Sequence, residues 1–386
     1  MMDSHTMKPA HRTPMLKRVD KFFIRRLEEL LPPISTPNAK YTSRDILRGV
    51  LGAVTDNDFV EGWTEHQREL GRQVPSGDLV HLRLGVLGHD MVLEAFNILN
   101  HELLVRMGKL EPWRAPVPLA IDFHNIPYFG VYRGGHVVGV KKEKGTKWGY
   151  QFVSSQVVCG RRCTLHAIPT GQFDRKEELL VQLLDVSQRH VVPSMTYLDR
   201  EFYTVGCLRL LEGRGSPYLM PARKDKKLVS EMNEDAPLSR VVGTRGWSYH
   251  RKVRPVGRKN DQVKVQTVFL YRPGEDEEDF AFVTNAEVND GNVEALADGY
   301  SGRWGIETGY RMKEMVRGKT CSQSHSVRRL FHLLSVLLYN LWQLMDSLLV
   351  HEFGEARLPW GYAIRLKSVI RMIRLWSEGM GGSMSI

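Results

Sequence analysis

Three carboxylates stand where a metal-dependent site for phosphodiester chemistry could form. Two apolar segments read as strands, and each runs directly into an aspartate, Asp122 after Ile121 and Asp199 after Leu198. If these strands are neighbours, both carboxylates meet at one edge of the sheet. Carboxylate oxygens suit Mg²⁺ or Mn²⁺, and two such ions about 3.5–4 Å apart can activate an attacking oxygen and stabilise a leaving one. Aspartates at strand ends also form turns and cap helices, so a purely structural role stays open.

A third carboxylate, Glu307, stands in the segment YSGRWGIETGYRMKE at positions 300–314. A helix over 292–316, turning about 100° per residue, places five of its polar side chains on one face: Tyr300, Arg303, Glu307, Arg311 and Glu314. An arginine on such a face can donate paired hydrogen bonds to a phosphate. The alternative is a solvated helix with ordinary i,i+4 ion pairs, and the apolar Ile306 beside these residues argues against full exposure.

The charge balance favours a polyanionic partner. The chain has 54 Lys and Arg against 44 Asp and Glu, a formal charge of +10, and cationic side chains release counterions when they bind nucleic-acid phosphates. This excess alone is weak support. The four cysteines contain no CxxC pair, and Cys159 and Cys163 flank a predicted turn with no second ligand pair. Buried reduced thiols are therefore expected instead of zinc, which fits a cytoplasmic protein.

The apolar segment 330–350 is long enough to cross a membrane. It carries polar residues at roughly helical spacing, namely His332, Asn340, Gln343 and Asp346. Such a polar stripe predicts a helix packed inside a folded protein. The charged first 30 residues lack the apolar core of a signal peptide. We therefore expect no membrane association.

Periodicity divides the chain into segments. Helices are expected over 16–31, from a Thr42-Ser43 cap onward, over 58–71 and over 77–108. A proline-punctuated linker follows, and then the order strand, strand, strand, helix, strand, helix, strand over 117–221, which predicts a sheet flanked by helices. Further strands are expected over 247–252, 262–271 and 280–284. The first 111 residues are predicted to bind DNA, with a packing or dimerisation module as the alternative.

Three blocks in this order resemble the catalytic blocks of insertion-sequence DDE transposases: AIDFHNIPYFG, YLDREFY and YSGRWGIETGYRMKE. The resemblance covers roughly 117–345. It implies an α/β fold with an RNase H-like (retroviral-integrase-like) core and a β-rich insertion, and the helical patterns before residue 110 add an N-terminal helical domain. The expected domains are 1–111 (helical, DNA-binding), 117–222 with 291–350 (catalytic core), 223–290 (insertion) and 351–386 (C-terminal helical segment and tail).

The resemblance also implies roles for single residues. Asp122, Asp199 and Glu307 would be catalytic and would ligate two Mg²⁺ ions, with Mn²⁺ as a substitute. Tyr300 and Arg303 would contact DNA phosphate. The motif lysine expected seven residues after the glutamate is absent, because that position is Glu314 and the nearest lysine is one residue early. Its role could pass to an arginine of the same segment, Arg311 or Arg317, and stays unassigned.

The predicted insertion offers DNA contacts of its own. Its second basic run contains Arg251, Lys252 and Arg254, with Trp247 just before it. Basic groups interleaved with aromatics suit contact with a DNA backbone together with base stacking. Trp247 is the candidate for stacking on a flipped base, and a strand-core role is its alternative.

These observations predict a DNA transposase that cuts the ends of its element and joins them to target DNA. The expected partners are double-stranded DNA, both element ends and target, and a second copy of the chain in a DNA-bound homodimer. Two alternatives remain at this stage. One is a catalytically inactive DNA-binding protein derived from a transposase, and the other is a nuclease on the same fold.

Overall fold

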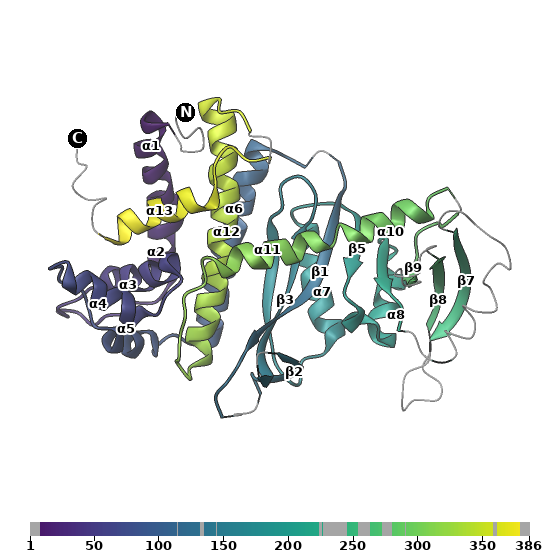
Figure 1. Ribbon diagram of the computed structural model, residues 1–386, viewed down its shortest axis with the longest axis horizontal. Helices are drawn as coiled ribbons and strands as arrows, with labels where there is room; N and C mark the ends of the chain where they lie inside the picture. Colours follow the sequence, from purple (N-terminus) through teal and green to yellow (C-terminus); the bar gives the residue numbers. More distant parts are fainter. Residues whose placement is uncertain are drawn as a thin grey trace. The chain divides into compact units, whose positions relative to one another are not determined.

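The computed structural model describes residues 8–113, 115–131, 135–143, 145–223, 226, 245–253, 263–271, 280–289, 291–357 and 361–378. The chain folds into two compact units. The first comprises Met1–Pro112, Cys163–Ala167 and Gly309–Ile386, and the second comprises Trp113–Arg162 and Ile168–Thr308. Figure 1 labels their helices and strands.

The first unit is helical apart from the start of one strand. Its first helical segment begins with α1 (Pro9–Val19), continues through a π-helical turn, η1 (Asp20–Ile24), and ends with α2 (Arg25–Leu30). The helix predicted over 16–31 therefore begins seven residues earlier, at Pro9. Its predicted end is confirmed, because Leu31 is already extended and the prolines that follow it cannot continue a helix.

The next helix, α3 (Ser43–Asp56), is held at its start by the predicted cap. Thr42 Oγ1 accepts a hydrogen bond from the Asp45 N–H, and the Asp45 carboxylate accepts one from the Thr42 N–H at 2.8 Å. This reciprocal capping box satisfies two backbone donors that the helix itself cannot pair. Because the residues are local in sequence, the cap was predictable without the fold.

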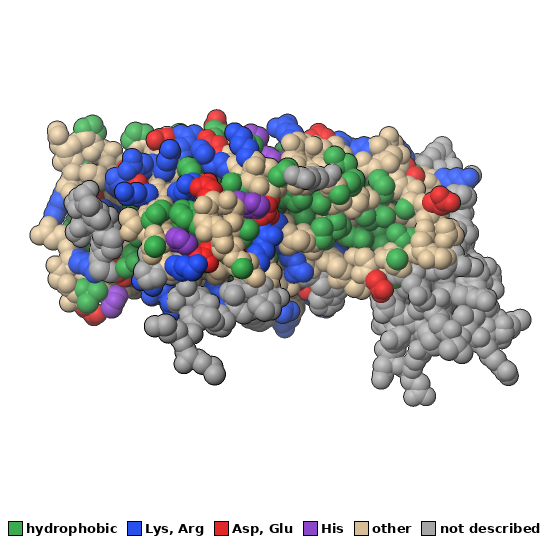
Figure 2. Space-filling model, turned by 90° about the horizontal axis from the view of Figure 1, so that it is seen from above, with side chains coloured by type: hydrophobic (Ala, Val, Ile, Leu, Met, Phe, Trp, Pro, Cys, Tyr) green, Lys and Arg blue, Asp and Glu red, His purple; other side chains and the backbone are tan. Residues whose placement is uncertain are grey.

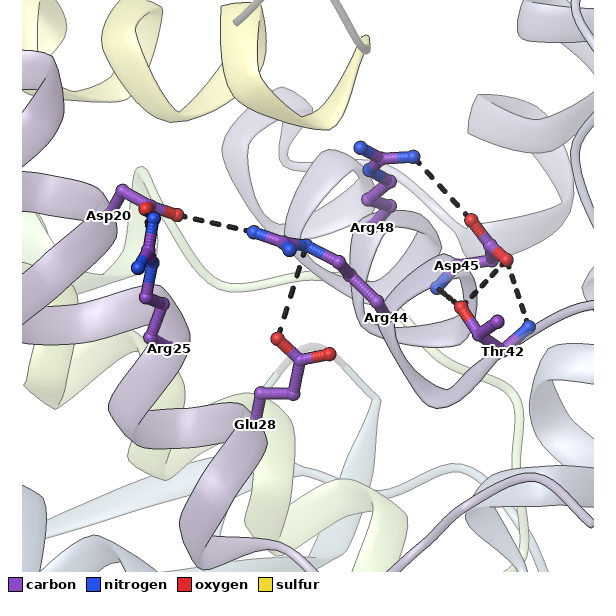
Figure 3. A network of polar contacts seen from close by, with 7 residues as sticks. All are labelled: Asp20, Arg25, Glu28, Thr42, Arg44, Asp45 and Arg48. Atoms are coloured by element: carbon purple, nitrogen blue, oxygen red, sulfur yellow. Dashed lines mark hydrogen bonds and ion pairs between the residues drawn. The ribbon is translucent and has the colours of Figure 1, made fainter. Parts of the chain in front are cut away.

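A network of ion pairs orients α3 against the preceding helices (Figure 3). The Arg44 guanidinium lies 3.3 Å from Asp20 of η1 and 3.9 Å from Glu28 of α2. Both Arg44 and Arg48 also lie over the ring of Trp376, at 5.7 and 5.5 Å. Partly exposed ion pairs stabilise a fold only slightly. We therefore expect this network mainly to set the direction of α3 relative to η1 and α2.

Three further helices complete the N-terminal part: α4 (Val60–Glu69), α5 (Gly77–Leu84) and α6 (His89–Leu110). The single helix predicted over 77–108 is wrong, because the chain breaks between α5 and α6. The N–H of Gly85 closes α5 on the carbonyls of His81 and Leu82, and Gly88 is extended (φ −72°, ψ 160°). Glycine weakens a helix interior, and two of them within four residues allow the turn.

The long helix α12 (His325–Phe353) forms the core of this unit and packs along α6. By length and composition α12 could cross a membrane, because an 18-residue stretch of it has a mean hydropathy of 1.5. However, 94% of that stretch is buried in the described structure. Its predicted polar stripe faces protein. Asp346 accepts the N–H groups of Ala363 and Ile364 at 2.6 and 3.1 Å. These bonds fix the segment that leads into α13 (Leu366–Ser377), which packs on α3.

Among the described residues, nine strands form one mixed sheet in the order β2-β3-β1-β5-β6-β9-β8-β7, with β4 beside β3. The first strands are β1 (Val117–Pro127), β2 (Val138–Glu143), β3 (Thr146–Val157) and β4 (Thr164–Thr170). β4 begins in the first unit and ends in the second. The edge strand β2 was not expected from the sequence, because its pattern of glycine and lysines lacks a clear apolar alternation.

The strands after β4 alternate with helices. In chain order these elements are α7 (Lys176–Gln188), β5 (Pro193–Leu198), α8 (Val205–Arg214) and β6 (Tyr218–Pro221). β1 runs antiparallel to β3 and parallel to β5, and β5 runs parallel to β6. Thus β4-β3-β1-β5-β6 form a mixed sheet, and α7 packs on its strand β3.

Three more strands continue the same sheet beyond β6: β7 (Arg245–Val253), β8 (Val263–Tyr271) and β9 (Phe280–Thr284). β9 pairs with β6, so Met220 lies opposite Val283. The strands that the sequence predicted for this segment therefore extend the central sheet.

Candidate active site

The two predicted aspartates lie on neighbouring strands, but only Asp199 follows a strand end. The prediction that the first strand ends at Asp122 is wrong, because β1 stays paired with β3 up to Pro127 and Asp122 lies within it. Ile121 of β1 pairs with Leu198 of β5 in parallel register, and the N–H of Asp199 donates to the Ile121 carbonyl at 3.2 Å. Asp122 and Asp199 are the residues that follow this pair in the chain, Asp122 within β1 and Asp199 just beyond β5. The condition set by the sequence, that the two strands be adjacent, is met.

Asp122 is buried, with 6% of its surface exposed. One carboxylate oxygen accepts the Phe123 N–H at 3.0 Å, and the other accepts a hydrogen bond from Arg303 Nη1 at 2.9 Å. Burial raises the pKa of Asp122 to about 7; Arg303 opposes this shift, and the nearby charge of Asp199 adds to it. The protonation state of this carboxyl thus changes near neutral pH.

The predicted helix over 292–316 is wrong in one respect: it is two helices, α10 (Val293–Ser301) and α11 (Trp304–Glu314) (Figure 1). The N–H of Gly302 bonds to Asp298, and that of Arg303 turns back to Tyr300 at 2.9 Å. Arg303 lies in this break, and its guanidinium reaches Asp122. Glu307 is in the first turn of α11, where the positive end of the helix dipole stabilises a carboxylate.

Arg303 contacts two of the three carboxylates, Asp122 and Glu307. Its Nη2 lies 3.7 Å from Glu307 Oε1 while its Nη1 bonds to Asp122. The exposed fractions of the three side chains are 13% for Arg303, 9% for Asp122 and 35% for Glu307. The guanidinium therefore connects a buried carboxylate with a more accessible one.

Tyr300 lies beneath this arginine. Its hydroxyl donates to the Leu198 carbonyl at 3.4 Å, and its ring packs edge-on against Tyr197 and Phe282. The Arg303 guanidinium stands 5.3 Å from the ring centroid. Burial raises the pKa of the Tyr300 phenol. Tyr300 is thus a neutral platform that supports Arg303 next to the end of β5.

Several residues that shape the site carried no signal in the sequence. Lys176, at the start of α7, lies 5.4 Å from the ring centroid of Phe123 and donates to the Glu201 carbonyl at 2.9 Å. Gln156 donates to the Gly305 carbonyl at 3.4 Å and so holds the start of α11 against β3. These contacts join segments that are distant in sequence, so spacing could not have predicted them.

The other predicted DNA-binding residues have no described contact with the three carboxylates, and several of them are described only in part. Arg311 is exposed on α11. For Trp247, Arg251 and Lys252 the structure describes the backbone of β7, where Trp247 pairs with Phe269 and Arg251 with Val265. Arg254 lies outside the described residues. Their contacts with DNA stay predictions.

The donor set suits a divalent cation, because three carboxylates are hard oxygen ligands and two of them already face a cationic group. Within the described part of the chain, however, no three His, Cys, Asp or Glu side chains are grouped closely enough to hold a metal ion. The Arg303 guanidinium stands between Asp122 and Glu307. The three carboxylates therefore have the chemistry of metal ligands, and the positive charge that two of them contact in this arrangement is the Arg303 guanidinium.

A family model described as "Transposase DDE domain" matches residues 116–341, more than half of the chain. The chain belongs to this family. No individual curated protein matches it significantly. Membership in the DDE transposase family implies a DNA substrate, divalent metal ions and an RNase H-like α/β fold, which agrees with the mixed sheet of the second unit. The matched range starts one residue before β1 and ends within α12.

In this DDE transposase domain the lysine nearest the motif position is buried. Lys313 is 3% exposed and lies 4.8 and 5.4 Å from the ring centroids of Tyr310 and Tyr339. Glu314, at the motif position itself, pairs with Arg317 at 2.6 Å. Lys313 is thus placed inside the first unit, away from solvent.

Replacing Lys313 by methionine should change how stability depends on pH. Burial lowers the pKa of Lys313 from 10.5 to about 7. Between these values the unfolded chain binds a proton that the folded chain does not, so stability rises with pH by about 1.4 kcal/mol per unit. Below about pH 7 the contribution is constant. Urea denaturation from pH 6 to 10 should show this rise in the wild type and lose it in Lys313→Met; a rise of equal slope in both proteins would contradict the assignment.

Proposed function

We propose that this chain is an active transposase that cuts the ends of its element and joins them to target DNA. Asp122, Asp199 and Glu307 are its catalytic residues and metal ligands. The observation that carries the proposal is the convergence of Asp122, within β1, and Asp199, directly after the parallel neighbouring strand β5, with Glu307 linked to Asp122 through Arg303. The family match supports it.

The three carboxylates are the ligands of two Mg²⁺ ions, with Mn²⁺ as a substitute. When bound, these ions activate the attacking oxygen and stabilise the leaving oxygen of a phosphodiester. Asp122 lies within β1 and Asp199 directly after the neighbouring strand β5, and Glu307 adds a third carboxylate from α11. Arg303, supported by the Tyr300 ring, can donate paired hydrogen bonds to a DNA phosphate. This chemistry needs no serine or cysteine nucleophile.

A basic surface on the first unit is the proposed DNA contact outside the site. Figure 2 shows Lys and Arg side chains gathered on one face of this unit. Exposed cations are carried by α1 with η1 and by α13, which pack on each other: Arg12, Lys17, Lys21, Lys367 and Arg371. We assign DNA binding to the N-terminal helices 1–111, to this surface and to the basic run of β7. A DNA-bound homodimer would hold two element ends.

The test is Mg²⁺-dependent nicking of a duplex that carries the DNA flanking the coding sequence, with wild type compared with Glu307→Gln. This substitution keeps the size of the side chain and removes its charge. We expect wild type to nick the duplex and then join the freed 3′ end to a second duplex, and the variant to do neither. Binding without cleavage by both proteins would indicate the non-catalytic DNA-binding alternative, and cleavage without joining would indicate a nuclease.

The rate of cleavage should fall as pH falls below neutral. A protonated carboxyl is a poor metal ligand, and the pKa of Asp122 is raised to about 7. We expect the rate in subsaturating Mg²⁺ to drop about tenfold per unit below pH 7 and to level off above it. Nicking rates measured from pH 5.5 to 9 test this. A flat profile over that range would exclude Asp122 as a ligand that must ionise.

A further inference from the structure

The contacts of Arg303 define a cationic bridge within the site. Its two terminal nitrogens lie at 2.9 Å from Asp122 and 3.7 Å from Glu307, and its side chain is 13% exposed. The other Asp122 oxygen accepts the Phe123 N–H. Both oxygens of the buried carboxylate therefore accept hydrogen bonds.

We propose that Arg303 is a latch that holds the metal ligands before any metal is bound and competes with divalent cations for them. This inference rests on the proposed function. A positive guanidinium in contact with two of the three carboxylates repels an incoming cation. It also prevents Asp122 and Glu307 from repelling each other, so the site stays assembled without a metal.

Arg303 also has a hydrogen-bond donor, Nε, that a DNA phosphate oxygen could accept from. Its Nε is buried and has no hydrogen-bond partner among the described residues. A guanidinium binds phosphate with a planar fork of donors, so a phosphodiester would satisfy Nε together with one terminal nitrogen. Rotation toward a phosphate would release Asp122 and Glu307. Arrival of DNA and binding of metal would then favour each other, because two ligands linked through one element couple reciprocally.

The first measurement is Mn²⁺ binding to the metal-free protein without DNA, followed by the electron paramagnetic resonance signal of free Mn²⁺. It is made at pH 8.5. Arg303→Met keeps much of the side-chain volume and removes the charge, so its Mn²⁺ affinity should be about tenfold higher than that of wild type. Arg189→Gln removes an exposed charge at the end of α7 and should bind Mn²⁺ as wild type does.

A third variant separates the latch from the site itself. Asp199→Asn should weaken Mn²⁺ binding in both the wild-type and Arg303→Met backgrounds. If Asp199→Asn weakens binding but Arg303→Met does not strengthen it, the latch is refuted and the metal site stands. If Mn²⁺ binding is absent or insensitive to Asp199→Asn, the proposed site fails and the latch with it.

A second experiment uses the wild type alone and so does not depend on whether Arg303→Met folds. Phenylglyoxal modifies accessible arginines, and mass spectrometry reports each site. Saturating Mn²⁺ should raise the modification rate of Arg303 about tenfold and leave that of Arg189 unchanged. Bound Mn²⁺ with an unchanged rate at Arg303 would overturn the proposal.

Discussion

Replacing Asp199 by alanine is expected to lower the rate of DNA cleavage by about a thousandfold and to leave DNA binding within about twofold of wild type. Metal ligation by carboxylates contributes several kcal/mol of transition-state stabilisation, and about 4 kcal/mol corresponds to a thousandfold in rate. Asp199 lies directly after β5, beside Asp122. Contacts of basic side chains with DNA phosphates do not involve this carboxylate, so affinity should persist.

The matched control is Asp298→Ala. Asp298 is an exposed carboxylate on α10, in the same unit and one turn before the break that contains Arg303. Its removal should leave the cleavage rate unchanged. Cleavage is followed on a labelled duplex and binding by gel shift. Equal loss of both activities in Asp199→Ala would show that the aspartate has a structural role in place of a catalytic one.

Replacing Asn340 by leucine is expected to lower the free energy of unfolding by about 4 kcal/mol. The buried amide of Asn340 accepts the Thr164 N–H at 3.0 Å and donates to Asn100 Oδ1 at 2.6 Å. Leucine would leave that N–H and that carbonyl oxygen buried without these partners. Each unsatisfied buried group costs about 1–3 kcal/mol. The amide therefore ties α12 to α6 and to the start of β4 within the first unit.

Gln343 provides a contrast on the same helix. It is 1% exposed, and neither its amide nitrogen nor its amide oxygen has a hydrogen-bond partner among the described residues. Because a buried amide without partners costs about 1–3 kcal/mol, Gln343→Leu should raise the free energy of unfolding by about 1 kcal/mol. Urea denaturation of both variants measures the difference. Similar destabilisation by both substitutions would contradict this account of the polar stripe.

Local features of the fold were predictable. The α3 cap follows from Thr42 and Asp45, which are three residues apart, and the strands that lead into Asp122 and Asp199 follow from short apolar runs, although the first of them continues past Asp122 to Pro127. The helix breaks were not predicted. A periodic pattern of apolar residues continues across Gly302, and the glycines at 85 and 88 do not by themselves show that the chain turns. Periodicity reports which face is buried, and it does not report whether the backbone stays helical between two buried faces.

The sequence by itself determined which carboxylates could form a site and that the segment 330–350 belongs inside a folded protein, because residue type, order and polar spacing are local properties. Only the tertiary structure decided the partners of those residues. It placed Arg303 on Asp122, 181 positions away. It buried Lys313 between two tyrosines and brought α12 and α13 together with the N-terminal helices in one unit. Such contacts depend on how distant elements pack and on which charges are desolvated together, and no spacing along the chain encodes them directly.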